Sequence, residues 1–194
     1  IQLLIWTINH WQHTLDREFI NLLINSFTLA AASGFTCVIF AIFFAYSKRS
    51  FQTKSIKTVI GIAGLGYAVP GTVIAIGVLA PIAWFDNKLD YLSRIYFDMP
   101  LGLVISGSMA ILVFAYLVRF LSISLNTMDS GLSAIKPGID ESARSLGASK
   151  KNVLIKVHLP ILKTSVLTAF LLVFVEVMKE LPTTLILRPF NFNT

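Results

Sequence analysis

The sequence of 194 residues has few charged side chains and almost no cysteine. Only 13% of the residues are charged, against about 25% in a typical soluble domain, while 55% are hydrophobic. The single cysteine, Cys37, excludes an internal disulfide, and no cysteine framework for a structural metal is present. A Gly-x-x-x-x-Gly-Lys-Ser/Thr loop for nucleotide phosphates is also missing. These absences exclude a disulfide scaffold and argue against a soluble enzyme.

Four apolar stretches are each long enough to cross a bilayer, which takes about 20 residues. The ranges 22–46 and 58–85 contain no charged residue. The range 101–125 contains Arg119, and the range 161–178 contains only Lys163 and Glu176, near its two ends. Because backbone polar groups in lipid need partners within the segment, we expect four helices. The sequence therefore predicts an all-α polytopic membrane protein, with 1–194 as one transmembrane domain.

The connecting segments differ in charge and so predict an orientation. The segment 47–57 holds four basic residues and no acid, and the longer segment 126–160 is also rich in Lys and Arg. The segments 1–18 and 85–100 instead mix both signs. Lys and Arg concentrate in cytoplasmic loops, so we expect the two basic segments to be cytoplasmic and Arg119 to lie near the cytoplasmic end of its helix. This placement accounts for the net charge of +6 without nucleic acid.

The leading segment leaves two interpretations open. Residues 1–6 are either the end of an earlier span or part of an amphipathic interfacial stretch, and Trp6 and Trp11 suit the membrane interface in both cases. His10 and His13 lie three residues apart without a third ligand nearby, which favours interfacial polar residues over a metal pair. Because the chain begins at Ile1, we expect it to be a fragment of a longer protein.

The second apolar range contains a proline in its middle. Pro70 removes one helical hydrogen bond and disfavours helical angles at Val69. Small residues at Gly64, Ala68, Gly71 and Ala75 would share one helix face and admit a close neighbour. The range is therefore either a deformable helix beside a translocation path or a tightly packed, kinked helix. Candidate path or gate residues in it are Tyr67, Pro70, Gly71 and Thr72.

Three charged residues follow the fourth apolar range. Glu176 can pair with Lys179 on one helix face, and Glu180 comes directly after. They are either part of an outer gate, with Glu176 and Glu180 as candidate gate residues, or an interfacial pair at the end of a helix.

The long basic segment predicts two helices joined by a glycine turn. Pro137 suits a first helical turn, and Gly147 suits a left-handed end. Between them, small or apolar residues fall on one face: Ile139, Ser142, Ala143 and Leu146. A second helix is expected from Ser149 to Pro160. The stripe suits either the groove of a cytosolic partner or the membrane surface, and its small residues favour the partner.

This segment resembles the signature of ABC-transporter permeases of bacterial importers. Glu141-Ser142-Ala143, Gly147 and Val157-His158-Leu159-Pro160 keep its spacing, with Ser142 and Val157 as conservative departures. The resemblance implies a type I, MetI-like helical bundle with a cytoplasmic coupling loop over 126–160. It also implies residues that couple to the ATPase: Glu141, Ser142, Ala143, Leu146, Gly147, Val157, Leu159 and Pro160.

Two further segments, 66–73 and 179–190, are similar to the iron(III) permeases. That similarity implies most of the second half of a two-half permease in a bacterial inner membrane, transporting iron(III). Thiamine, polyamines and phosphonates remain alternative solutes, and the metal ligands are unknown. The implied partners are a pair of cytosolic ATP-binding subunits, a periplasmic solute-binding protein, a second permease half and the lipid bilayer. We expect ATP to be used by the partner and no cofactor to be bound by this chain. An ion-gradient transporter is disfavoured because the spans lack central acids.

Overall fold

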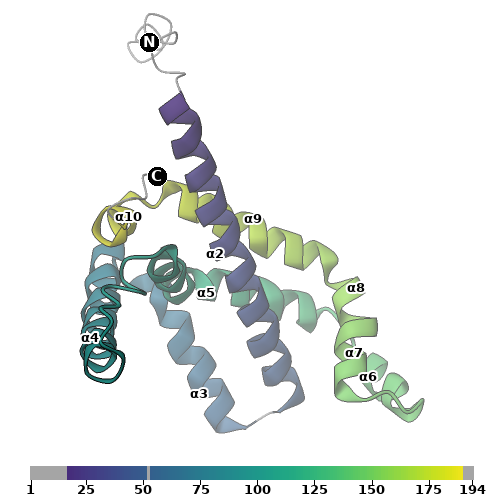
Figure 1. The fold of residues 1–194 in the computed structure, drawn as a ribbon. Helices are drawn as coiled ribbons and strands as arrows, with labels where there is room; N and C mark the ends of the chain where they lie inside the picture. Colours follow the sequence, from purple (N-terminus) through teal and green to yellow (C-terminus); the bar gives the residue numbers. More distant parts are fainter. Residues whose placement is uncertain (1–16, 52, 190–194) are drawn as a thin grey trace, which may run out of the picture.

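The computed structural model describes residues 17–51 and 53–189, and all regular elements of this part are helices (Figure 1). In chain order they are α2 (Arg17–Ser50), α3 (Lys54–Ala63), η1 (Gly64–Ala68), α4 (Gly71–Phe97), α5 (Met109–Ser133), α6 (Pro137–Ser145), α7 (Lys150–Val153), η2 (Leu154–His158), α8 (Leu159–Ile161), α9 (Lys163–Lys179) and α10 (Leu181–Leu187). The expected all-α class is confirmed. The predictions for residues 1–16, including His10 and His13, lie outside the described residues.

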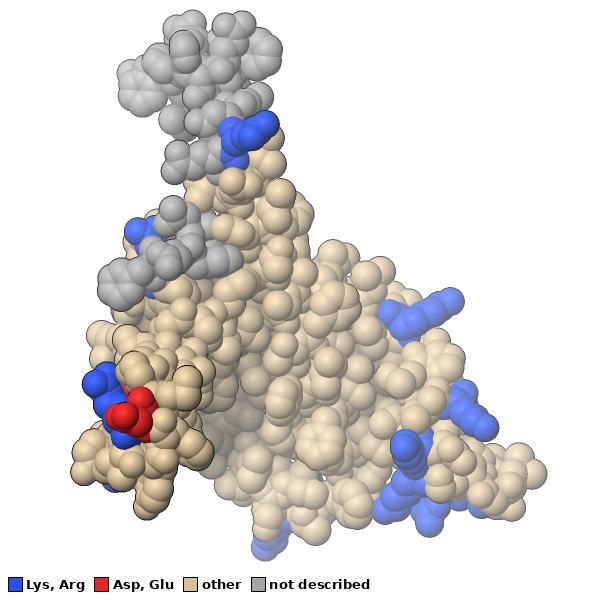
Figure 2. Space-filling view, in the orientation of Figure 1, with Lys and Arg blue, Asp and Glu red and all other residues tan. Residues whose placement is uncertain are grey.

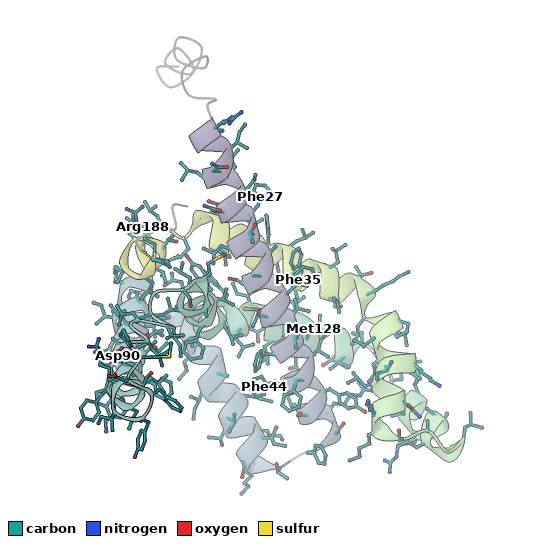
Figure 3. All side chains as sticks on the ribbon, viewed as in Figure 1. Phe27, Phe35, Phe44, Asp90, Met128 and Arg188 are labelled. Atoms are coloured by element: carbon teal, nitrogen blue, oxygen red, sulfur yellow. The ribbon has the colours of Figure 1, made fainter. Side chains whose placement is uncertain are left out.

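Helix α5 forms the centre of the bundle and packs against α2, α9, η1 and α4. Its largest fully buried side chains are Ile111, Leu112, Tyr116, Phe120 and Met128. Helix α2 crosses α9 through aromatic contacts, with Phe27 near Phe174 and Phe35 near Phe170 (Figure 3). The core therefore lies where α2, α5 and α9 meet.

Three helices are long and apolar enough to cross a membrane: Phe19–Ser50, Gly71–Phe97 and Met109–Ser133. The segment Lys150–Ile161 and helix α9 form a further pair bent by 74°, which is a fourth span if the pair is counted as one. Large apolar side chains such as Phe35, Ile39 and Phe43 are more than 60% exposed on α2. Such a surface suits lipid or another membrane subunit rather than water.

The first and last predicted ranges agree closely with helices. The range 22–46 lies within α2, and the range 161–178 corresponds to α9. The range 58–85 is divided at Val69 and Pro70 into α3 with η1 on one side and α4 on the other. Helix α4 also continues to Phe97, through most of the segment expected to be a loop.

The third predicted range was wrong in its position. Helix α5 begins at Met109 and ends at Ser133, so it is displaced toward the C-terminus from 101–125. Residues 101–108 form turns instead, because the buried carboxylate of Asp86 accepts hydrogen bonds from the Ile105 and Ser106 amides and the Ser106 hydroxyl. Ser108 then caps α5 by accepting from the Ala110 amide. The apolar run 101–105 belongs to a folded connection.

The displacement also corrects the placement of Arg119. With α5 at Met109–Ser133, this residue lies near the middle of the helix rather than at its cytoplasmic end. Its side chain is only 17% exposed and pairs with Glu180. Arg119 therefore has a half-buried partner instead of reaching the membrane surface.

Most of the basic side chains gather on one side of the molecule. Figure 2 shows Lys and Arg at the lower right, around α6 to α9, and at the bottom, by the start of α3. A separate group of mixed sign lies over α4 at the left of that view. This distribution agrees with the charge difference between the connecting segments, from which the orientation was predicted.

Candidate functional sites

The signature segment folds as two helices joined by a glycine turn. Gly147 has φ +84°, the left-handed conformation that the sequence predicted. The Gly147 amide donates to the Arg144 carbonyl at 2.9 Å, and the Ala148 amide donates to the Ala143 carbonyl at 3.0 Å. These two bonds form a Schellman motif, which satisfies carbonyls at the end of α6. The glycine thus fixes where α6 ends and where the chain turns toward α7.

The apolar stripe of α6 faces outward. Leu146 is 89% exposed and Ile139 is 38% exposed, while Ser142 is also exposed and Ala143 is half-buried. Glu141 lies on the exposed surface as well. A short helix that presents an apolar end in this way is suited to the groove of another protein.

The second half of the signature lies on a continuous but irregular helical segment. Ser149 caps α7 by accepting from the Asn152 amide, and the turn Leu154–His158 is a π-helix. Val157 and Leu159 are half-buried, whereas Pro160 is exposed. Pro160 has no amide hydrogen to donate, and a wider turn directly precedes it. The segment continues to Ile161, slightly beyond the predicted end.

The inner face of α6 is held by a cluster that the sequence analysis missed. Asp140 lies 2.8 Å from Arg49 Nε at the end of α2 and 2.6 Å from Nε2 of the fully buried His158. Arg49 also donates to the carbonyls of Leu132 and Ile135 at the end of α5. We call Arg49, Asp140 and His158 the anchor cluster. It ties α6 to α2, to η2 and to the end of α5.

The charge of Asp140 is stabilised by these neighbours. Partial burial pushes its pKa up, but hydrogen bonds with Arg49 and His158 outweigh this and hold the pKa below its ordinary value. A carboxyl whose pKa is lower in the folded state than in the unfolded state stabilises the fold at any pH above the unfolded-state pKa. This stabilisation is lost as the pH falls through the folded-state pKa. The anchor cluster is therefore intact at neutral pH.

The break at Pro70 allows η1 to approach α5 closely. A side chain at Gly66 would overlap the Val118 backbone, so glycine is needed there. Gly64 has open space around it and Ala68 is exposed, whereas Gly71 and Ala75 are buried. The predicted face of four small residues is therefore divided. The reason is that 64–68 winds as a 3-10 helix and Val69 is extended, which ends the α-helical spacing.

A second break lies beside the first. Helix α9 ends at Lys179, Glu180 is extended, and α10 begins at Leu181. Arg119 joins the two breaks: its Nη2 lies 3.3 Å from Glu180 Oε2, and its Nη1 donates to the Val69 carbonyl at 3.2 Å. Thr183 donates to Glu180 at 2.8 Å. Arg119, Glu180 and Thr183, packed around Gly71, form what we call the break cluster.

The structure brings only some of the candidate gate residues together. Gly71 and Glu180 meet in the break cluster, next to Pro70. Glu176 pairs with Lys179 at 2.8 Å on the exposed surface, the helical pair that the sequence allowed. Tyr67 and Thr72 are exposed. Arg119 was missed as a partner because its expected position was at a helix end.

No preformed metal centre is found in the part of the chain that the structure describes. Residues 17–51 and 53–189 contain no group of three or more His, Cys, Asp or Glu side chains that could hold a metal ion. The break cluster offers one carboxylate, paired with a guanidinium, and the hydroxyls of Thr183, Thr184 and Tyr116 nearby. It is a polar cluster that joins helices rather than a ligand cage.

A helical membrane bundle with two broken helices and an outward-facing helix–glycine–helix segment fits the membrane subunit of a transporter. A family model for the binding-protein-dependent transport system inner membrane component matches residues 37–188. The chain belongs to this family, and it is a multi-pass protein of the bacterial inner membrane.

Curated relatives share the class at low identity. The Fe(3+)-transport system permease protein FbpB 2 of Haemophilus influenzae is 25% identical over 177 residues, which is 91% of this chain and 32% of the relative. A putative 2-aminoethylphosphonate transport system permease protein, PhnV of Salmonella typhimurium, is 24% identical over 97% of this chain and 65% of the relative. The chain thus spans about a third of the first relative and just under two thirds of the second.

Proposed function

We propose that this chain moves iron(III) across the inner membrane as part of an ATP-driven importer, and that α6 is the docking element for a separate ATPase subunit. The observation that supports docking is that one face of α6 is exposed while its opposite face is held by the anchor cluster. Leu146 is 89% exposed at the end of α6, while Asp140 on the same helix binds Arg49 and His158. A fixed helix loses little freedom on binding and passes on any displacement it receives.

The proposed mechanism is alternating access between two packings of the bundle. ATP binds to the partner pair and draws the docked α6 elements together. Arg49 then transmits the movement to α2, and the segment from η2 to α8 transmits it to α9. Helix α9 ends at Lys179, directly before Glu180 of the break cluster, so the movement reaches the two helix breaks. A solute-binding protein would deliver the solute at the outer ends of the helices, near residues 98–108 and α10. A second permease half would complete the path.

The choice of solute rests on relatives and on local similarity. The relative named as an Fe(3+) permease and the similar segments 66–73 and 179–190 support iron(III). Ferric ion prefers hard oxygen ligands, which Glu180 and the neighbouring hydroxyls provide if the ion pair opens. The relative named for 2-aminoethylphosphonate supports a phosphonate as the second candidate, since the same opening would free the Arg119 guanidinium for an anion. Thiamine and polyamines rest on the resemblance alone.

The test is transport by the full-length permease with its ATPase pair and its solute-binding protein in proteoliposomes. Iron(III) carried by the binding protein should accumulate inside only with ATP. An excess of 2-aminoethylphosphonate should leave that uptake unchanged. ATP-dependent uptake of the phosphonate without uptake of iron would replace the first candidate by the second. If neither solute moves, both solute assignments fail.

A further inference from the structure

An apolar groove lies between the end of α2 and α3. The side chains that line it are Phe43, Phe44, Ser47, Phe51, Ser55, Ile56, Val59 and Ile60. Several of them are well exposed, with Phe43 at 64% and Val59 at 52%. The groove lies beside the end of α2, one of the helices long and apolar enough to cross a membrane.

A basic pocket lies at the same end of α2. It is lined by Tyr46, Arg49, Ser50, Asp140, Arg144, Lys150 and Val153. The single acid, Asp140, is already paired with Arg49. Within residues 17–51 and 53–189, neither Arg144 nor Lys150 takes part in an ion pair. Two cationic side chains of the pocket are therefore left to attract an anion.

Phe51 and Lys150 connect the two features. The Lys150 ammonium lies 4.1 Å from the centre of the Phe51 ring, and Phe51 lines the apolar groove. The backbone of Lys150 is fixed to α2 because the Tyr46 hydroxyl donates to its carbonyl at 2.6 Å. A positioned cation thus stands at the end of an apolar groove. This combination suits a molecule with an anionic head and an apolar tail.

We propose that the groove and the pocket together bind an anionic phospholipid of the inner leaflet, with its phosphate at Lys150 and Arg144 and an acyl chain between α2 and α3. The charge distribution predicts that this end of α2 is cytoplasmic, and cytoplasmic leaflets carry anionic lipids that attract basic residues. A helix of another subunit would need only the groove, and a free phosphate would need only the pocket. The phospholipid alone uses both. The site is separate from the break cluster and independent of which solute is transported.

The experiment uses the purified complex of full-length permease and ATPase, exchanged into equimolar phosphatidylglycerol and phosphatidylcholine. Native mass spectrometry then counts the lipids that remain bound. The unmodified complex should retain phosphatidylglycerol preferentially. Lys150→Gln should lower its retention about fivefold, as expected when one basic contact to an anionic lipid is lost. Lys156→Gln is the matched control, because it removes the same charge from an exposed lysine outside the pocket.

A second pair of variants tests the acyl chain. Val59→Trp should fill the groove and lower retention with every charge intact, and Ser55→Phe repeats this test from another exposed position. Ile62→Trp is the control, since Ile62 is 64% exposed on α3 outside the groove. Each variant must still co-purify with the ATPase, which shows that it has folded.

Three results would overturn the proposal. Equal retention of the two lipids excludes selectivity for an anionic headgroup, and an equal loss in Lys150→Gln and Lys156→Gln shows general electrostatic attraction only. Full retention of phosphatidylglycerol in both groove-filling variants would show that no acyl chain lies in the groove. If glycerol phosphate, which has no acyl chains, then displaces phosphatidylglycerol, the pocket binds the phosphate group alone. Lipid retention is measured without solute, so failure here leaves the proposed transport function standing.

Discussion

Two glycines near the candidate sites are required for different physical reasons. Gly147 has a left-handed backbone, and a Cβ atom added there would meet no other atom within 4 Å, so only its conformation favours glycine. Gly71 has no such backbone constraint, but a side chain there would overlap Glu180, Thr183 and Arg119. Substitution therefore acts on the backbone at the first position and on packing at the second.

Gly147→Val should loosen the end of α6. The left-handed conformation costs a β-branched residue about 1–2 kcal/mol, whereas Asn tolerates it better. Hydrogen exchange of the α6 amides should rise in Gly147→Val and change little in Gly147→Asn, and ATPase co-purification should fall in the same order. Equal behaviour of the two variants would show that the left-handed turn is not what positions α6.

Gly71→Ala should disturb the break cluster. The added methyl group must push aside the side-chain ends of Glu180, Thr183 and Arg119, which weakens the partly buried Arg119–Glu180 pair. Uptake and thermal stability should therefore both fall. Gly77→Ala in the same helix is the control, because nothing lies within 4 Å of that position. Uptake by the two variants is compared in membranes that contain equal amounts of permease. Equal uptake by Gly71→Ala and Gly77→Ala would contradict the proposed packing.

Some residues of the candidate sites could be predicted from the sequence and others could not. Gly147 could be predicted because a helix end is a local feature, with its signal within a few residues. The anchor cluster could not, since Arg49 and Asp140 lie 91 residues apart and only the fold joins them. Its one visible sign is a polar side chain, His158, between apolar neighbours in the signature segment.

Helix α4 and the connection after it show why an element boundary was misplaced. The run 101–105 is apolar enough to extend a predicted span, and hydropathy carries no information about its hydrogen bonds. Those bonds go to Asp86, on the preceding helix. Asp90, which is labelled in Figure 3, lies one turn further along and accepts from the Gly102 amide. The predicted range 161–178 was accurate for α9, which spans Lys163–Lys179.

Asp86→Asn should release residues 98–108 from α4. The carboxylate accepts from three donors, two amides and a hydroxyl, whereas an amide side chain presents its own hydrogens to at least one of them. Limited digestion from the outer side should cleave this segment faster, by about fivefold for a loss near 1 kcal/mol. Asp98→Asn is the control, since Asp98 is exposed. Equal cleavage in both variants would show that Asp86 does not hold the connection.

The predicted orientation concerns the whole molecule and can be tested by labelling. In a Cys37→Ala background, Thr53→Cys should be protected from an impermeant thiol reagent in intact spheroplasts. Met99→Cys, which replaces a side chain that is 65% exposed, should react. The expectation follows from the concentration of Lys and Arg around the first position. The reverse labelling pattern would invert the orientation, and it would also place the proposed lipid site in the outer leaflet.

The signature segment and the break cluster lie at opposite ends of α9. Arg49 connects α6 to the end of α2, and α9 leads from the signature segment to Glu180. Helices α2 and α9 also pack against each other and against α5, which carries Arg119. We propose that a displacement of α6 reaches the break cluster through these packed elements. Docking and transmission should then be separable by mutation.

Arg49→Gln should uncouple transport while leaving the ATPase bound. It removes the ionic partner of Asp140 behind α6, whereas the exposed face with Glu141 and Leu146 is unchanged. Uptake should fall about fivefold or more, which corresponds to the lower end of typical coupling free energies. The ATPase should still co-purify with the permease. Glu141→Lys should instead weaken co-purification itself, because it reverses a charge on the docking face.

Lys48→Gln is the matched control for Arg49→Gln. It removes the same charge from the neighbouring residue. Lys48 pairs with Asp129, and the two side chains are 37% and 36% exposed. An exposed pair of this kind contributes little, so both uptake and co-purification should remain near those of the unmodified protein. If Arg49→Gln transports as well as Lys48→Gln, the anchor cluster does not transmit movement. Displacement of α6 would then have to reach the break cluster through η2, α8 and α9 alone, across the 74° bend that separates that segment from α9.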